Sequence, residues 1–167
     1  MAYGDDDTSW QNVKVELVQQ GFMFKKGEGT FGSWKKRYIK LLSDKSIEYY
    51  VDESLSNMKG SINLDNITSN DIITSDKTPK NNEYKWGFMI IQKKRKWIFA
   101  VQTKKDMDLW MNNIKDVVND EYFKKKAKKS ELERKKVELK QNNKYGRSLK
   151  DKYKQRRQNN NNNNGYN

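Results

Sequence analysis

The chain has 167 residues, a mean hydropathy of -1.20 and 34% charged residues, which fits one domain of ordinary size with added segments that bury little apolar surface. It contains no cysteine and no histidine, which excludes disulfides, thiol nucleophiles, thiolate or imidazole metal sites and the commonest general base. The net charge of +13 is concentrated late in the chain, because residues 121–158 hold 16 Lys and Arg against 5 acids, whereas residues 1–120 hold 19 against 17.

Residues 1–14 form an acidic, polar segment that does not resemble a secretory signal. From Val15 to Val101, short apolar and aromatic runs are separated by clusters of Gly, Asn, Asp and Ser, which is the spacing of strands and turns. The sequence therefore predicts seven strands in a meander, at residues 17–25, 34–42, 46–51, 59–64, 71–75, 84–92 and 96–102.

A helix is predicted directly after the last strand. Thr103 is a suitable N-cap, and Asp106 stands three residues later as a looser form of the capping box. Apolar residues then recur at helical spacing, which predicts an amphipathic helix that covers the sheet. These residues are Met107, Trp110, Met111, Ile114, Val117 and Val118.

The segment beyond residue 120 has a different composition. Residues 121–141 are basic and rich in helix formers, with a Glu131 to Lys135 pair, but their apolar anchors are few (Leu132, Val137 and Leu139). Residues 142–167 are basic and then rich in asparagine, which predicts a disordered tail. No apolar run is long enough to span a bilayer, so any membrane contact is expected to be peripheral.

Four separated motifs occur in an order that resembles the pleckstrin homology (PH) family. They are GFMFKKG at residues 21–27, WKKRYIKL at 34–41, IEYY at 47–50 and KGSINL at 59–64, and DLWMNNI at 108–114 completes the pattern with Trp110. The resemblance implies an α+β, mostly β fold over residues 15–120. In this fold a bent, seven-stranded antiparallel barrel or sandwich is capped by one C-terminal helix.

The resemblance also suggests a ligand site. Members that bind 3-phosphorylated inositides have a lysine at the end of the first strand and a K/R-x-R pattern on the second, which Lys25, Lys35 and Arg37 match. Strand alternation places Lys35 and Arg37 on one face and Lys36 on the other. Several cationic donors suit a cluster of phosphates, and arginine can donate two parallel N–H groups.

Two further positions match these members: Tyr49, whose hydroxyl would reach a ring phosphate, and Lys59. Backbone N–H groups of the Gly27–Gly32 loop could add donors. Phe31, at the loop tip, is a candidate membrane contact, although packing back onto the barrel mouth is an equally ordinary interpretation. The hairpin at 92–96 departs from the family pattern, because it is short and basic where some members carry a longer insertion.

The sequence thus predicts a non-enzymatic module with no catalytic residues, cofactor or metal. We expect it to bind phosphoinositide headgroups, PtdIns(3,4,5)P3 or PtdIns(3,4)P2, and the anionic membrane surface. It would act as a cytoplasmic signalling adaptor that is recruited to the inner face of the plasma membrane. The alternative is a PH-like scaffold for an unidentified protein partner, whose basic tail binds anionic lipid or nucleic acid non-specifically; nucleic acid is not the expected partner.

Overall fold

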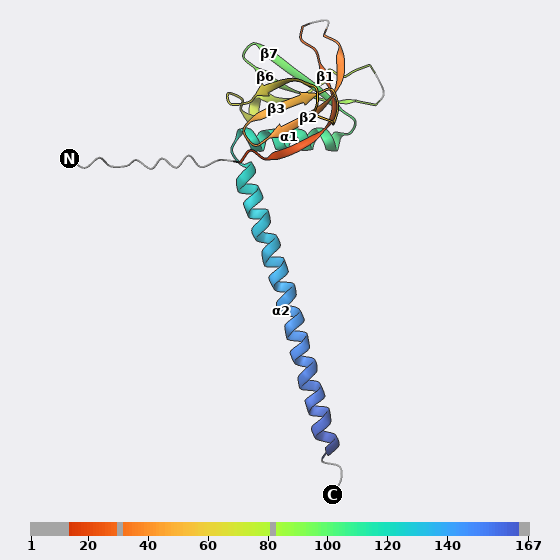
Figure 1. Ribbon diagram of the computed structural model, residues 1–167, viewed down its shortest axis with the longest axis vertical. Coiled ribbons are helices and arrows are strands. Elements are labelled where there is room, and N and C mark those ends of the chain that lie inside the picture. Colours follow the sequence, from red (N-terminus) through yellow and green to blue (C-terminus); the bar gives the residue numbers. More distant parts are fainter. Residues whose placement is uncertain (1–13, 30–31, 81–82, 164–167) are drawn as a thin grey trace, which may run out of the picture. The chain divides into compact units, whose positions relative to one another are not determined.

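A computed structural model of the chain describes residues 14–29, 32–80 and 83–163. The chain divides into two compact units, Met1–Tyr122 and Phe123–Asn167. The first unit contains the strands and a short helix, and the second contains most of a long helix (Figure 1).

The described part of the first unit forms one seven-stranded antiparallel sheet, as predicted. The strand order is β4-β3-β2-β1-β7-β6-β5, so β1 pairs with both β2 and β7. The strands are β1 (Leu17–Lys26), β2 (Trp34–Leu42), β3 (Ser46–Tyr50), β4 (Met58–Asn63), β5 (Ile72–Ser75), β6 (Trp86–Gln92) and β7 (Arg95–Val101), with a 3-10 turn, η1 (Ser69–Asp71), before β5. The largest difference from the predicted bounds is β6, which begins at Trp86, two residues later than expected.

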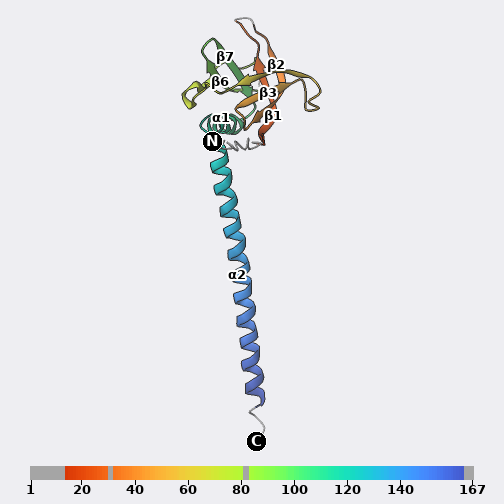
Figure 2. The ribbon, with the colours of Figure 1, turned by 60° about the vertical axis from the view of Figure 1, so that its left-hand side comes forward.

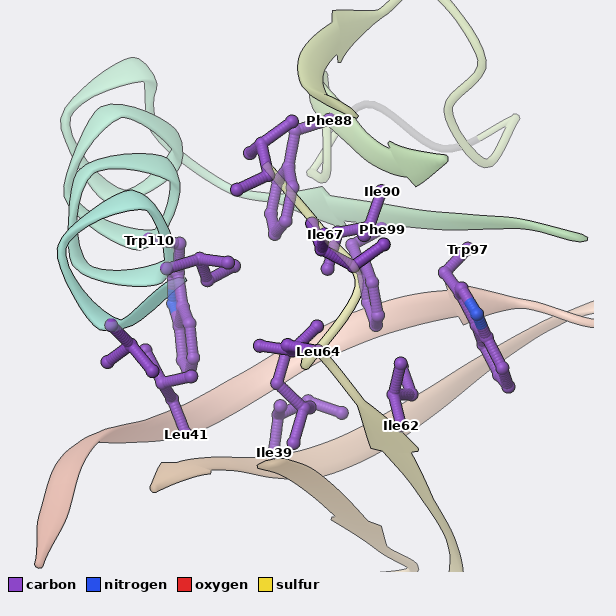
Figure 3. Close-up of a cluster of buried hydrophobic side chains, with 14 of the residues drawn as sticks. Ile39, Leu41, Ile62, Leu64, Ile67, Phe88, Ile90, Trp97, Phe99 and Trp110 are labelled. Atoms are coloured by element: carbon purple, nitrogen blue, oxygen red, sulfur yellow. The ribbon is translucent and has the colours of Figure 1, made fainter. Parts of the chain in front are cut away.

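Apolar side chains on the inner face of the bent sheet form the core. Ile39 and Leu41 of β2 and Phe99 of β7 are at most 1% exposed, and residues from every other strand and from η1's flanks join them. Figure 3 shows Trp110 directed from the helix toward Leu41, while Trp97 lies on the far side of the same cluster. The core therefore separates the helix from the end of the sheet near Trp97.

The predicted capping helix is confirmed as α1 (Lys104–Val118). The Thr103 hydroxyl accepts a hydrogen bond from the backbone N–H of Asp106 at 3.0 Å and donates to its carboxylate at 2.6 Å. This cap fixes where the helix begins. The predicted apolar stripe is buried against the sheet, with Met111 partly buried, and Figures 1 and 2 both show α1 on the same side of the strands.

The second unit differs from the prediction. The helix α2 (Tyr122–Asn163) continues through residues that the sequence predicts to be disordered. The prediction of disorder rested on the basic, asparagine-rich composition of residues 142–167, but a helix satisfies its backbone groups locally and needs no core to do so. The predicted ion pair is present, with Lys135 Nζ at 2.6 Å from Glu131 Oε1. Within the described residues, no helix combines the length and apolar character needed to cross a bilayer.

Candidate anion-binding site

A cationic pocket of about 440 Å³ opens at the end of the sheet near Trp97. It contains all five residues predicted to bind a headgroup. The lining residues are Lys25, Gly27, Glu28, Gly32, Ser33, Lys35, Arg37, Tyr49 and Lys59. The structure brings the predicted residues together, while their binding role stays a prediction.

The inner faces of β1 and β2 change from apolar to basic as the strands approach this pocket. Met23 and Ile39 are buried in the core, and Lys25 and Arg37 follow two residues nearer the open end on the same faces. Lys25 pairs directly with Lys35 across the two strands. The same alternation that builds the core thus delivers three cations to its open end.

Lys36 points to the opposite face of the sheet, as predicted. It pairs with Phe24, and its Nζ lies 4.9 Å from the centre of the Phe22 ring. The Phe22 ring meets Tyr38 edge to face on this outer surface, with the ring centres 5.0 Å apart. Lys36 is therefore a natural control for its two neighbours.

Lys59 reaches the pocket because of an irregularity in β4. Tyr49 pairs with Gly60, but Tyr50 pairs with Met58, so Lys59 is an extra residue in a β-bulge. A bulge interrupts the alternation of side chains and can redirect one of them. Simple alternation from Gly60 would have put Lys59 on the outer face.

Gly60 also determines where Tyr49 can lie. Its φ is +152°, and a Cβ at this position would collide with the ring and hydroxyl of Tyr49. The missing side chain gives the Tyr49 ring room over β4, beside the pocket. Tyr49 is thereby held with its ring centre 6.5 Å from that of Trp97.

Among the residues that the structure describes, Lys25 is the one buried charged side chain, at 8% exposed. Its Nζ lies 4.5 Å from the centre of the Tyr49 ring and 4.9 Å from that of Trp97, so the two rings face the ammonium group. Burial, followed by the positive charges of Arg95 and Arg37, lowers the pKa of Lys25 to about 8. The pocket thus holds a lysine whose charged form is destabilised, and a bound anion would stabilise that form.

The sequence did not predict that Arg95 and Trp97 lie beside Lys25 at the edge of the pocket. Trp97 lies two residues before core residue Phe99 on the same face of β7, and Arg95 lies two residues before Trp97. The Arg95 guanidinium carbon stacks 3.5 Å from the centre of the Trp97 ring. Alternation along β7 could have predicted that Trp97 and Arg95 share the inner face with Phe99. In the basic run at 93–96, however, the sequence alone does not show which residue faces inward.

Glu28 is the acidic member of the pocket lining. Its carboxylate lies 3.4 Å from Arg95 Nη2, and its charge opposes the lowering of the Lys25 pKa. Glu28 therefore occupies the same positive field that would attract an external anion.

In the described part of the glycine loop, two backbone N–H groups are already engaged within the loop. The N–H of Gly27 already donates to the carbonyl of Ser33 at 2.9 Å, and that of Gly32 donates to Gly29 at 3.3 Å. A side chain on Gly32 would collide with the backbone at Gly27 and Glu28, so this glycine permits the close turn. Phe31, the predicted membrane contact, lies outside the described residues.

The fold and this site define a class: a small β-rich domain with a helix across one end of its sheet and a basic pocket at the other. The PH domain family model matches residues 17–119, which is more than half of the chain. The chain belongs to the PH-domain family. PH domains bind lipids or proteins and are in general non-enzymatic modules.

Several solved structures are similar to this chain. The PH domain of human pleckstrin homology domain-containing protein family A member 5 is 25% identical, with 70% of this chain and 88% of that chain covered and a TM-score of 0.46. The C-terminal PH domain of pleckstrin, solved in complex with D-myo-Ins(1,2,3,4,5)P5, is 20% identical, with 61% and 98% covered and a TM-score of 0.49. Human FAM129B/MINERVA/NIBAN2 is 15% identical, with 64% and 22% covered and a TM-score of 0.52, a likeness of fold alone. No curated protein matches the chain.

Proposed function

We propose that the chain is a phosphoinositide-binding module that is recruited from the cytoplasm to the inner face of the plasma membrane. The observation that carries the proposal is the convergence of Lys25, Lys35, Arg37, Tyr49 and Lys59 on one open pocket. The expected ligands are the headgroups of PtdIns(3,4,5)P3 and PtdIns(3,4)P2. A module of this kind would act as a signalling adaptor without chemistry of its own.

The chemistry of the pocket suits a small, highly charged anion. Arg37 offers a planar set of N–H donors for two oxygens of one phosphate, and its Nη1 is steadied by donating to the Lys36 carbonyl at 2.8 Å. A bound anion would stabilise the charged form of Lys25, which burial and the neighbouring cations disfavour. The Tyr49 hydroxyl would add a neutral donor, and Lys35 and Lys59 would close two further sides.

Binding would occur in two stages. Long-range attraction between the positive chain and the anionic leaflet comes first and contributes about 1 kcal/mol for each Lys or Arg held near the surface. Capture of one headgroup by the pocket follows and supplies the selectivity. The first stage is non-specific and sensitive to salt, whereas the second depends on the arrangement of the pocket residues.

The test is co-sedimentation of the intact chain with vesicles that contain each phosphoinositide in turn, at physiological salt. The Lys35→Ala/Arg37→Ala variant removes two pocket cations, and Lys36→Ala removes one cation from the opposite face of the same strand. We expect selective binding to 3-phosphorylated inositides that the double variant loses and that Lys36→Ala largely keeps.

Equal binding of all three proteins to every anionic vesicle would reject the pocket as the site. Intact localisation in cells of the Lys35→Ala/Arg37→Ala variant would instead favour the protein-binding scaffold, in which the pocket is incidental.

A further inference from the structure

The C-terminal half of α2, residues 139–157, has an uneven distribution of charge. It carries eight Lys and Arg and a single acid, Asp151, whereas the preceding residues of the helix, 123–138, carry eight bases and three acids. The side chains described in this half are exposed. This half therefore carries a net charge of +7, against +5 for the residues before it.

Three large apolar side chains lie on one face of this half. Tyr145, Leu149 and Tyr153 follow one another at intervals of four residues, which places them one above the other on an α-helix. They are 73%, 56% and 67% exposed. This row, the Tyr145–Leu149–Tyr153 face, buries little within the unit that contains it.

Half of the cations in this segment lie on the same side of the helix as this face. At about 100° per residue, Arg156, Lys152 and Arg157 lie about 20°, 60° and 80° from Leu149, and Lys150 follows at about 100°. The other four, Lys140, Lys144, Arg147 and Lys154, lie at about 140–180°. Asp151 lies about 160° away, on the opposite side of the helix. The one acid of this half thus points away from whatever the face contacts.

We infer that this face lies in the interface of an anionic phospholipid bilayer, with the helix parallel to the membrane. Tyrosine has an apolar ring and a polar hydroxyl, which suits the boundary between headgroups and acyl chains. Leu149 between the two rings enters the apolar side, and the bordering cations meet lipid phosphates.

A nucleic acid explains this arrangement less well. The two tyrosines lie about 12 Å apart along the helix, much further than neighbouring stacked bases, and a leucine separates them. Phosphate contacts would also give no role to Leu149. Binding of the same face to RNA is an alternative that the experiment distinguishes.

The inference rests on the proposed function for its setting, a membrane, but it uses none of the pocket residues. The two contacts are joined in one chain, so each raises the effective concentration of the other at the membrane. A weak interfacial helix and a headgroup pocket together hold a surface more firmly than either alone.

The absence of cysteine allows a direct test on the intact chain. Single cysteines introduced by Tyr145→Cys, Leu149→Cys, Tyr153→Cys, Arg147→Cys and Asp151→Cys would each carry a polarity-sensitive fluorophore. With phosphatidylcholine vesicles that contain 30% phosphatidylserine and no phosphoinositide, we expect blue-shifted emission and quenching by lipid-bound quenchers at 145, 149 and 153, and little change at 147 and 151. Equal changes at all five positions, or none, would overturn the inference.

A charge-preserving variant provides the second arm. Tyr145→Gln/Leu149→Gln/Tyr153→Gln should bind the same vesicles about tenfold or more weakly, because the apolar contact is lost. Asn143→Gln/Ser148→Gln, with substitutions outside the face, should bind as the parent does. Undiminished vesicle binding by the triple variant, or loss of RNA oligonucleotide binding in place of vesicle binding, would contradict the bilayer contact.

The two proposals fail separately. Soluble inositol phosphate, titrated into the intact chain, reports on the pocket, and the triple variant should bind it normally. If soluble inositol phosphate does not bind to the parent chain while the fluorophores still enter phosphatidylserine vesicles, only the proposed function is wrong. If the inositol phosphate binds while the fluorophores stay in water, only the bilayer contact is wrong.

Discussion

At the scale of single residues, Lys25 has the most unusual environment. Its ammonium group is buried between two aromatic rings and beside other cations, which lowers its pKa to about 8. Burial destabilises the charged form, so between about pH 8 and 10.5 the unfolded chain binds more protons at this position than the folded chain. Folding stability from this residue therefore rises with pH across that window and is lowest below it.

The same shift predicts a pH dependence of ligand binding. A bound phosphate favours protonated Lys25, so binding takes up a proton once the free pocket has begun to lose it. We expect the affinity for a soluble inositol phosphate to fall up to about tenfold between pH 7 and pH 9, as measured by calorimetry in buffers of different ionisation enthalpy. Lys25→Met should bind weakly at both pH values with no such slope; an unchanged slope in this variant would assign the proton to another group.

Glu28 gives a second prediction at this scale. Its carboxylate lines the pocket and would repel an incoming phosphate. Glu28→Gln should therefore tighten binding of a soluble inositol phosphate several-fold, and the gain should shrink at high salt. Weaker binding in this variant would mean that Glu28 chiefly holds Arg95 in position through their 3.4 Å contact.

At the scale of elements, the β3–β4 pair determines two of the pocket residues together. The bulge at Lys59 and the bare α-carbon of Gly60 turn one lysine inward and let the Tyr49 ring lie over β4. Both effects come from one short stretch of backbone. The pocket is therefore sensitive to residues that do not touch a ligand.

Gly60→Ala tests this dependence. The new methyl group meets the Tyr49 ring and occupies a backbone conformation that favours glycine, so we expect the first unit to lose about 1–3 kcal/mol of unfolding free energy. All five tryptophans lie within residues 1–122, so their fluorescence in urea reports on this unit. Headgroup affinity should fall as well, while Gly146→Ala, whose new methyl group would meet nothing within 4 Å, should leave both quantities unchanged.

At the scale of the whole molecule, charge is divided between a nearly balanced domain and a strongly basic helix. Residues 121–158 carry a net charge of +11 of the total of +13. Anion binding by the domain would thus depend on where a few cations are placed, whereas attraction of the helix to an anionic surface would depend on how many cations it carries. These two modes of attraction respond differently to salt.

We predict that the affinity of the intact chain for phosphatidylserine vesicles without phosphoinositide falls steeply between 50 and 500 mM salt, about tenfold or more. Binding of a soluble inositol phosphate to the pocket should weaken less, since its charge pairs are close and partly desolvated. Parallel salt dependences in the two titrations would show that the same long-range attraction governs both.

The sequence by itself determined the local features of this protein. Strand alternation placed Lys35 and Arg37 on one face and Lys36 on the other, and Thr103 with Asp106 marked the start of α1. These features depend on residues that are only a few positions apart. At that range the side-chain period of a strand or helix and the hydrogen bonds of a helix cap determine the structure. The family resemblance added Tyr49 and Lys59. Alternation from buried Ile47 also puts Tyr49 on the inner face, but it could not have placed Lys59, which lies in a bulge.

Tertiary structure alone decided the electrostatics of the pocket. Closure of the sheet pairs Lys25 of β1 with Phe99 of β7, and this pairing brings Trp97 and Arg95 beside Lys25 from 72 and 70 positions away along the chain. The lowered pKa of Lys25 follows from burial, then from the charge of distant Arg95 and that of Arg37 on β2, and local sequence does not encode this environment. The helical state of residues 142–163 was likewise not evident from composition, because weak local preferences there are summed over a long segment.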